Sequence, residues 1–218
     1  DVTGTLTTDN YLLLIYGADW VTFRHLTFQR TGSSTYGTVI RIDSVSIGIT
    51  IENSIITGPT TTATTNNSSL IFAASGGISI DSITTIRNNL MQNGSYGIYM
   101  SSANATFRVA RNVIENNLIV NCGNRGIHLE NQRRIRVSNN IIQSATTTTQ
   151  FIGIYSNNCD RGIEIIGNKV TGTSGGLCYG LQMTTCTAVT GQPGLIANNF
   201  FSSNCNSEGY GILLTACT

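Results

Sequence analysis

The sequence predicts an all-β fold, a single-stranded right-handed parallel β-helix of about seven coils, each with three short strands. Three observations support this prediction: an internal repeat, a short alternating strand after each copy of the repeat, and a total of only 2 prolines in 218 residues. Proline removes a backbone donor, so its scarcity favours uninterrupted strand pairing. Helical repeats need a helical period and leucine-rich repeats need a fixed LxxLxL frame, and the sequence has neither.

The repeat is a polar pair followed by two apolar residues, as in IENNLIVNCG at residues 114–123. Seven copies, 23 to 35 residues apart, have as their second apolar residue Phe28, Ile56, Met91, Ile119, Ile142, Val170 and Phe201. Two positions earlier, five copies carry asparagine: Asn89, Asn117, Asn140, Asn168 and Asn199. Asparagine tolerates left-handed backbone geometry, and its amide can bond to the same residue one coil away. We therefore expect a structural asparagine ladder whose rungs, such as Asn117, both turn the chain and stack.

A strand with period-two alternation follows each copy and usually opens with glycine: YGTVIRI, SLIFA, YGIYM, RGIHL, IGIYS, YGLQM and YGILL. SLIFA, which starts at Ser69, is uncertain because GGISI at Gly76 competes with it. A further short apolar element, such as RIRV or GIEII, completes each coil. The Thr-rich stretches 57–69 and 143–150 are interpreted as turns of variable length. One inward column is expected to consist of Ile98, Ile127, Ile154, Leu181 and Ile212.

Alternation also assigns residues to the outer face of this first sheet. One outward column is predicted to contain Val39, Ile71, Tyr99, His128, Tyr155, Gln182 and Leu213. The column beside it is predicted to contain Arg41, Ala73, Ser101, Glu130, Asn157, Thr184 and Thr215. Rings next to hydrogen-bonding groups suit a sugar chain. The candidate glycan-binding residues are therefore Tyr99, His128, Glu130, Tyr155, Asn157 and Gln182.

The 6 cysteines all lie in the second half of the chain and form no CxxC pair, so neither a zinc site nor a thioredoxin-type motif is indicated. Cys159, Cys186 and Cys217 each follow the glycine of their strand by six residues. We expect them to stack as an unbridged thiol ladder, because parallel Cβ vectors suit a disulfide poorly. Cys178 and Cys205, in neighbouring turns, are the candidate disulfide pair.

The composition limits the functions that the chain can have. Only 11% of residues are charged, against about a quarter in ordinary soluble domains. The net charge of +1, with one local cluster at Arg133, Arg134 and Arg136, gives no footprint for nucleic acid, and the cluster is interpreted as a solvated edge. No apolar run approaches membrane-spanning length, so no membrane insertion is expected. We predict one β-helix domain over residues 1–218, with no cofactor and no metal.

No catalytic residue is assigned from the sequence. A glycoside hydrolase needs closely placed carboxylates, and a lyase needs a base that is commonly assisted by Ca²⁺. The chain has 11 acidic residues and none of the expected catalytic phrases. The one assembly that could serve a lyase is His128 with Glu130 and Arg133. His25 stands where other copies carry asparagine, so we expect it to make a turn hydrogen bond.

The phrases IRNNLMQNGSYGIYM, IENNLIVNCGNRGIHL and LIANNFFSSN resemble the right-handed β-helix repeats of the pectin-lyase-like superfold over essentially the whole chain. GADWVTFRHLTFQ and EIIGNKVTG are similar to segments of large secreted or cell-surface proteins of Bacteroidetes. This resemblance implies a segment of a longer chain that is exported by the type IX secretion machinery and has flanking domains as partners. It also implies O-glycosylation at Ser44 and Ser82, which stand in Asp-Ser-apolar triplets.

Repetition without a catalytic cluster favours an adhesin-like role: a stiff β-helical segment of a secreted or cell-surface protein that binds a polysaccharide or glycoprotein along one sheet face. Two alternatives stay open. The chain could be a polysaccharide lyase or glycoside hydrolase of the same superfold, or a passive stalk or exported cargo segment with no ligand. Because open coil ends are sheet edges, we also expect flanking residues or a partner to cover them.

Overall fold

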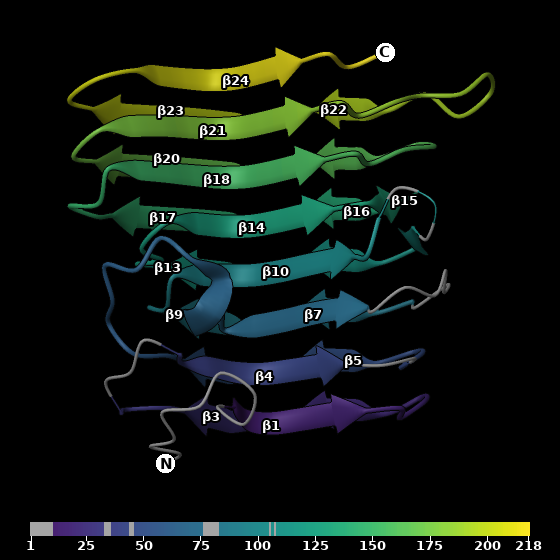
Figure 1. Ribbon diagram of the computed structural model, residues 1–218, viewed down its shortest axis with the longest axis vertical. Helices are drawn as coiled ribbons and strands as arrows, with labels where there is room; N and C mark the ends of the chain where they lie inside the picture. The colour runs from purple at the N-terminus through teal and green to yellow at the C-terminus, as the bar shows by residue number, and fades with distance from the viewer. Residues whose placement is uncertain (1–10, 33–35, 44–45, 76–82, 105, 107) are drawn as a thin grey trace.

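The computed structural model describes residues 11–32, 36–43, 46–75, 83–104, 106 and 108–218. They form coils stacked along one axis, and the strands of successive coils make three parallel sheets that run the length of the stack. This confirms the predicted β-helix (Figure 1). With the N-terminus at the bottom of Figure 1, the strands facing the viewer run from left to right and those behind run back, so the coil is right-handed.

Each of seven coils gives one strand to each sheet, and the last strand adds an eighth to the first sheet. The first sheet consists of β1 (Tyr11–Tyr16), β4 (Thr38–Asp43), β7 (Ile71–Ser75), β10 (Tyr96–Ser102), β14 (Arg125–Glu130), β18 (Gln150–Asn157), β21 (Leu177–Thr184) and β24 (Gly209–Thr215). The second consists of β2 (Thr22–Arg24), β5 (Thr50–Glu52), β8 (Thr85–Arg87), β12 (Val113–Glu115), β16 (Arg136–Ser138), β19 (Glu164–Ile166) and β22 (Leu195–Ala197). The third consists of β3 (Thr27–Gln29), β6 (Ile55–Thr57), β9 (Leu90–Gln92), β13 (Leu118–Val120), β17 (Ile141–Ala145), β20 (Lys169–Ser174) and β23 (Phe200–Cys205).

A pair of short strands and one 3-10 helix lie outside these sheets. The short strands β11 (Val109–Ala110) and β15 (Gln132–Arg133) pair at the corner between the first and second sheets. The 3-10 helix η1 (Asn66–Ser68) lies within the Thr-rich insertion. In the part of the chain that the structure describes, no helix has the length and apolar character needed to cross a membrane.

The core is a set of stacked apolar columns. In the first sheet, Ile98, Ile127, Ile154 and Leu181 pair in register as predicted and are fully buried. Ile212 continues this column in the last coil but is 46% exposed. Burying one such side chain contributes about 1.5–3 kcal/mol. The interior coils therefore hold most of the hydrophobic stabilisation.

The glycines that open the first-sheet strands are explained by close packing between coils. A Cβ atom on Gly126 would lie 2.5 Å from Cγ2 of Ile142 and 2.6 Å from the carbonyl oxygen of Gly153. Any side chain at this position would push β14 away from β17 and β18. Glycine is required here because no room is left for a side chain. Its backbone conformation is not the reason, since its φ angle lies outside the left-handed region.

The asparagine pair of each repeat divides two roles between its members. Asn116 has the left-handed φ of 55°, while Asn117 is buried. The backbone N–H and the side-chain amide of Asn117 both donate to Oδ1 of Asn140 at 3.0 Å, and its amide also donates to the carbonyl of Ile86. The prediction that Asn117 itself turns the chain is wrong, because the turn belongs to the residue before it. His25 takes the same left-handed position in the first coil.

The stacked amides continue through five coils. The same bonding joins Asn89 to Asn117, Asn140 to Asn168 and Asn168 to Asn199. Ser54 extends the column by donating its backbone N–H to Oδ1 of Asn89. Each rung satisfies buried polar groups of the coil before it and the coil after it. We refer to these five asparagines as the asparagine ladder.

The uncertain strand and its register are resolved by the structure. SLIFA forms β7, while GGISI lies outside the described residues. Val39 and Ile71, predicted to face outward, are fully buried, and the register places Arg41 and Phe72 in line with Tyr99. The alignment on the first glycine fails because Gly37 stands four residues before Arg41, whereas Gly97 stands two residues before Tyr99 in the same column. The outward column therefore begins with different residues from those predicted.

Candidate functional site

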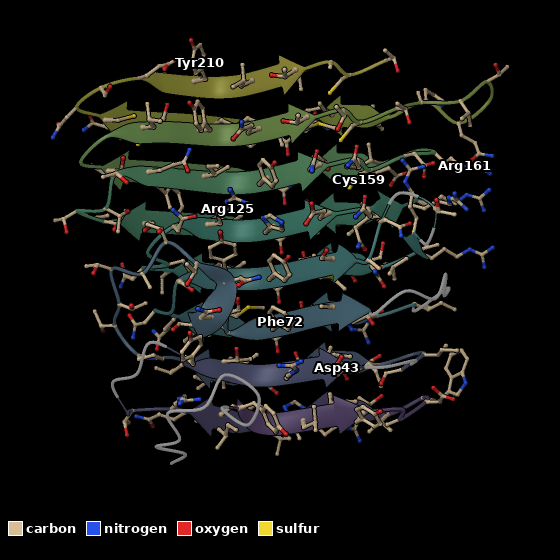
Figure 2. All side chains as sticks on the ribbon, viewed as in Figure 1. Asp43, Phe72, Arg125, Cys159, Arg161 and Tyr210 are labelled. Atoms are coloured by element: carbon tan, nitrogen blue, oxygen red, sulfur yellow. The ribbon has the colours of Figure 1, made fainter. Side chains whose placement is uncertain are left out.

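The outer face of the first sheet carries a continuous column of planar side chains, which we call the ring column: Phe72, Tyr99, His128 and Tyr155. The register aligns them on β7, β10, β14 and β18, with Arg41 before them and Gln182 after them. Figure 2 shows two labelled residues of this face, Phe72 and Arg125, on the front of the molecule. Parallel pairing places each side chain directly over its equivalent in the next coil.

The rings of this column stack on one another. Ring centroids are 5.0 Å apart for Phe72 and Tyr99, 4.6 Å for Tyr99 and His128, and 4.9 Å for His128 and Tyr155, with interplanar angles of 11°, 22° and 30°. Such contacts contribute about 0.5–1.5 kcal/mol each beyond area burial. The ring faces therefore contact each other and the ring edges point outward. A sugar on this sheet would meet ring edges and the polar groups beside them.

Arg125, which the sequence analysis did not select, covers part of the ring column. Its guanidinium carbon lies 4.1 Å from the ring centroid of Tyr155 and 5.4 Å from that of Tyr96, and its Nη1 contacts Nδ1 of His128. Cation–π contacts of this kind favour a fixed guanidinium. The sequence did mark Arg125 as unusual, because in RGIHL an arginine replaces the tyrosine or isoleucine that usually stands before the strand glycine.

His128 is enclosed by these neighbours and is only 6% exposed. Burial lowers the pKa of its imidazole, and the positive charge of Arg125 acts in the same direction against the opposing effect of Glu130. The ring is therefore neutral near pH 7. Because solvent reaches so little of it, His128 acts as a structural part of the column, and its contact with a glycan stays a prediction.

Glu130 has the polar neighbours that the predicted register gives it. Its carboxylate accepts hydrogen bonds from Ser101 Oγ and Asn157 Nδ2, both at 3.3 Å. The nearby His128 ring, together with Asn157 and Ser101, holds the pKa of the Glu130 carboxyl below its ordinary value. Glu130 is therefore ionised near neutral pH. We call Ser101, Glu130, Asn157 and Thr184 the polar row; these residues pair in register beside the ring column.

The proposed lyase assembly does not form. His128 Nε2 lies 3.7 Å from Glu130 Oε2, beyond hydrogen-bond length. Arg133 turns to the neighbouring corner, where its Nε is 3.2 Å from Oδ1 of Asp160. The reason is that β15 pairs outside the first sheet, so residues three positions after Glu130 belong to a different surface.

A pocket of about 90 Å³ opens at the N-terminal end of the ring column. Its walls are formed by Tyr11, Tyr36, Thr38, Arg41, Asn66, Asn67 and Phe72. The Thr-rich insertion forms one side, because the backbone N–H of Gly37 donates to the carbonyl of Asn67 and Tyr96 Oη donates to that of Thr64. Arg41 is held by Asp43, with Nη2 to Oδ2 at 2.8 Å. Periodicity could not reveal this pocket because an insertion builds half of it.

All six cysteines are free thiols. The sulfurs of Cys159, Cys186 and Cys217 lie 3.4, 3.5 and 3.6 Å from the carbonyl oxygens two residues before them, so the three form the predicted unbridged ladder. Cys178 and Cys205 are unbridged in this structure, and the disulfide suggested for this pair stays a prediction. The two thiols lie within hydrogen-bonding reach of each other: burial, and after it a side-chain hydrogen bond with Cys178, raises the pKa of Cys205 to about 11.

Two further predictions concern modification and metal binding. Ser44 and Ser82, the candidate O-glycosylation sites, lie outside the described residues. Among the residues that are described, no group of three or more His, Cys, Asp or Glu side chains is arranged to hold a metal ion. The candidate site on the first sheet therefore consists of the pocket, the ring edges and the polar row.

Comparison with known proteins agrees with this architecture. The family model described as the right-handed β-helix region matches residues 11–218. No curated protein and no solved structure matches the chain. Because the match spans nearly all of the sequence and the three parallel sheets have the geometry of that fold, the chain belongs to the right-handed β-helix family.

Proposed function

We propose that this chain is a stiff, adhesin-like β-helical segment of a secreted or cell-surface protein, and that it binds a glycan on the outer face of its first sheet. Stiffness follows from three sheets that run without interruption from the first coil to the last. Buried apolar columns and the asparagine ladder resist bending between coils because each coil is bonded to both neighbours.

The observation that carries the glycan proposal is the pocket between the Thr-rich insertion and the ring column. It combines an aromatic wall, amide groups and a guanidinium that is held in place, which is the mixture that fixes the orientation of a sugar. Phe72 belongs both to the pocket and to the ring column. A glycan seated there would continue along the polar row, past Glu130 and Asn157.

The surface chemistry supports a weakly charged ligand for this face. Only 11% of residues are charged, and Thr, Ser, Asn and Gly supply most of the polar positions. Glu130 shares its hydrogen bonds with Ser101 and Asn157, so the row offers both donors and acceptors. Neutral hydroxyl groups of a sugar are suitable partners for both.

The test is a glycan array probed with the unaltered chain and with Phe72→Ala, followed by titration of any glycan that binds. We expect Phe72→Ala to weaken binding by about tenfold or more, because it opens the pocket wall. Tyr210→Ala is the matched control, since Tyr210 stacks on Tyr179 at the far end of the same sheet. Equal affinity of Phe72→Ala and the unaltered chain would place the glycan elsewhere, and a silent array would favour the passive stalk.

Export through the type IX machinery, O-glycosylation and an origin in Bacteroidetes are further parts of this proposal that rest on sequence resemblance alone. A catalytic role has weaker support. The base nominated for a lyase is buried, and its expected partner Arg133 is bound to Asp160.

A further inference from the structure

A second polar feature lies at the corner between the first and second sheets, and we call it the arginine corner: Arg108, Arg111, Arg133, Arg134 and Arg161. Three of its members, Arg111, Arg134 and Arg161, occupy the same position in three successive coils. The backbone N–H of each donates to a carbonyl of the next coil, that of Arg133, Asp160 or Thr187. Figure 2 shows Arg161 at this corner, beyond the ends of the first-sheet strands.

The backbone at these three positions is unusual for arginine. Their φ angles are 63°, 52° and 55°, within the left-handed region. Elsewhere in this chain asparagine is the most frequent residue with such an angle, as at Asn116 and Asn139. Side chains with a Cβ atom are disfavoured there, and like charges on adjacent coils repel. Neither effect stabilises the fold, and such unfavourable positions concentrate at functional sites.

The charges at the corner are poorly balanced. Asp160 is 4% exposed and is approached by Arg108, by Arg133 at 3.2 Å and by Arg161 at 3.7 Å. Within the described part of the chain, the side chain of Arg134 bonds to the side-chain oxygen of Gln192, at 3.4 Å, and to no carboxylate.

Arg111 is exposed, and no hydrogen bond or ion pair of its side chain is found with the described residues. Glu164, on the adjoining sheet, is already paired with Arg136 at 3.8 Å. Among the residues described, three guanidinium groups therefore share one buried carboxylate, and those of Arg111 and Arg134 form no ion pair, in a chain whose net charge is only +1. The buried carboxylate fixes the inner arginines and leaves the outer ones directed to solvent.

We propose that the arginine corner binds an acidic polysaccharide, a glycan with a carboxylate or sulfate group on successive sugars, lying along the axis of the β-helix. A guanidinium pairs with either group through two parallel hydrogen bonds. Coils are about 4.8 Å apart, a spacing close to the length of one pyranose ring, so successive arginines would meet successive anionic groups. This site is independent of the glycan pocket proposed on the first sheet.

A single-stranded nucleic acid is the less suitable partner. Proteins that bind it combine a basic groove with aromatic side chains on which the bases stack. The cation–π contacts of the described residues involve Arg41, Arg125 and Lys169, and none involves a member of the arginine corner. The corner therefore offers charge and hydrogen bonds without a stacking platform.

The test compares binding of alginate and chondroitin sulfate to the unaltered chain and to the double variant Arg111→Asn/Arg134→Asn. We expect binding at low salt to weaken about tenfold or more, and the slope of log affinity against log salt to fall by about two. Since asparagine is the residue that this chain itself uses at left-handed positions, the variant should fold, which circular dichroism and thermal unfolding would verify.

The matched control is Arg24→Gln/Lys169→Gln, which removes the same charge from exposed positions on the second and third sheets. It should bind both polysaccharides within about twofold of the unaltered chain. An equal loss in the control would overturn the proposal, as would failure of the unaltered chain to bind either polysaccharide. Tighter binding of single-stranded DNA than of alginate would assign the corner to nucleic acid. Phe72→Ala should leave alginate binding unchanged, so this test and that of the pocket can fail separately.

Discussion

The asparagine ladder and the ring column are both stacks of side chains repeated once per coil, but they differ in composition. The ladder uses one residue type because every rung must donate to one neighbour and accept from the other. The ring column mixes phenylalanine, tyrosine and histidine, since stacking requires only a flat ring. A buried polar column therefore restricts which residue can occupy each position. A half-exposed aromatic column requires only a flat ring, so its polar groups can vary and can contact a ligand.

The largest effect on stability is expected from Asn117→Ala. The substitution removes the oxygen that accepts from the backbone N–H and the side-chain amide of Asn89, at a cost of about 1–3 kcal/mol for each unsatisfied group, while Oδ1 of Asn140 keeps the backbone N–H of residue 117. We expect a loss of about 3 kcal/mol in the free energy of unfolding, measured by urea denaturation. Asn116→Gly is the adjacent control and should change it by less than about 0.5 kcal/mol, because glycine accepts the left-handed turn. Equal losses in both variants would contradict the division of roles within the pair.

A smaller effect is expected from Tyr99→Leu, which removes two ring contacts from the middle of the ring column. The free energy of unfolding should fall by about 1 kcal/mol, since each stacked pair contributes about 0.5–1.5 kcal/mol and leucine retains part of the buried area. Tyr16→Leu, on the exposed end of β1, is the control and should be nearly neutral. A loss as large as that of Asn117→Ala would mean that the ring column is as structural as the ladder.

The smallest effect concerns the pH dependence of His128. Its pKa in the folded state is lowered by burial, so the unfolded chain binds the proton more tightly. The neutral ring therefore stabilises the fold fully above the ordinary histidine pKa of about 6.5. This stability is lost as the pH falls from that value through the lower pKa of the folded state. Removing the charge with Arg125→Gln should raise the pKa of His128.

An NMR titration of the histidine ring would measure this pKa, with His25→Gln leaving a single histidine signal to follow. An unchanged pKa in Arg125→Gln would show that burial alone accounts for the shift. A fall in the pKa would contradict the contact between the guanidinium and the imidazole.

Much of the fold could be predicted because it obeys local rules. The spacing of the asparagines and the alternation of the glycine-opened strands lead directly to the inward column from Ile98 to Ile212 and to the row containing Glu130 and Asn157. The errors arose where the repeat length changes. Val39 and Ile71 were assigned in place of Arg41 and Phe72 because Gly37 stands farther from the column than the later glycines do and SLIFA has no glycine to align.

Local periodicity therefore specified the coil, its three strands and the residues that stack in its interior, because each of these depends on a pattern contained within one repeat. Contacts between distant segments set the remaining features. The Thr-rich insertion folds back over the first sheet, Arg125 covers the ring of Tyr155 on the next coil, and arginines from three coils gather around Asp160. Arg108, for example, contacts Asn158 and Asp160, which lie 50 and 52 positions later; these separations correspond to no single repeat, so only the stacking of the coils brings the residues together.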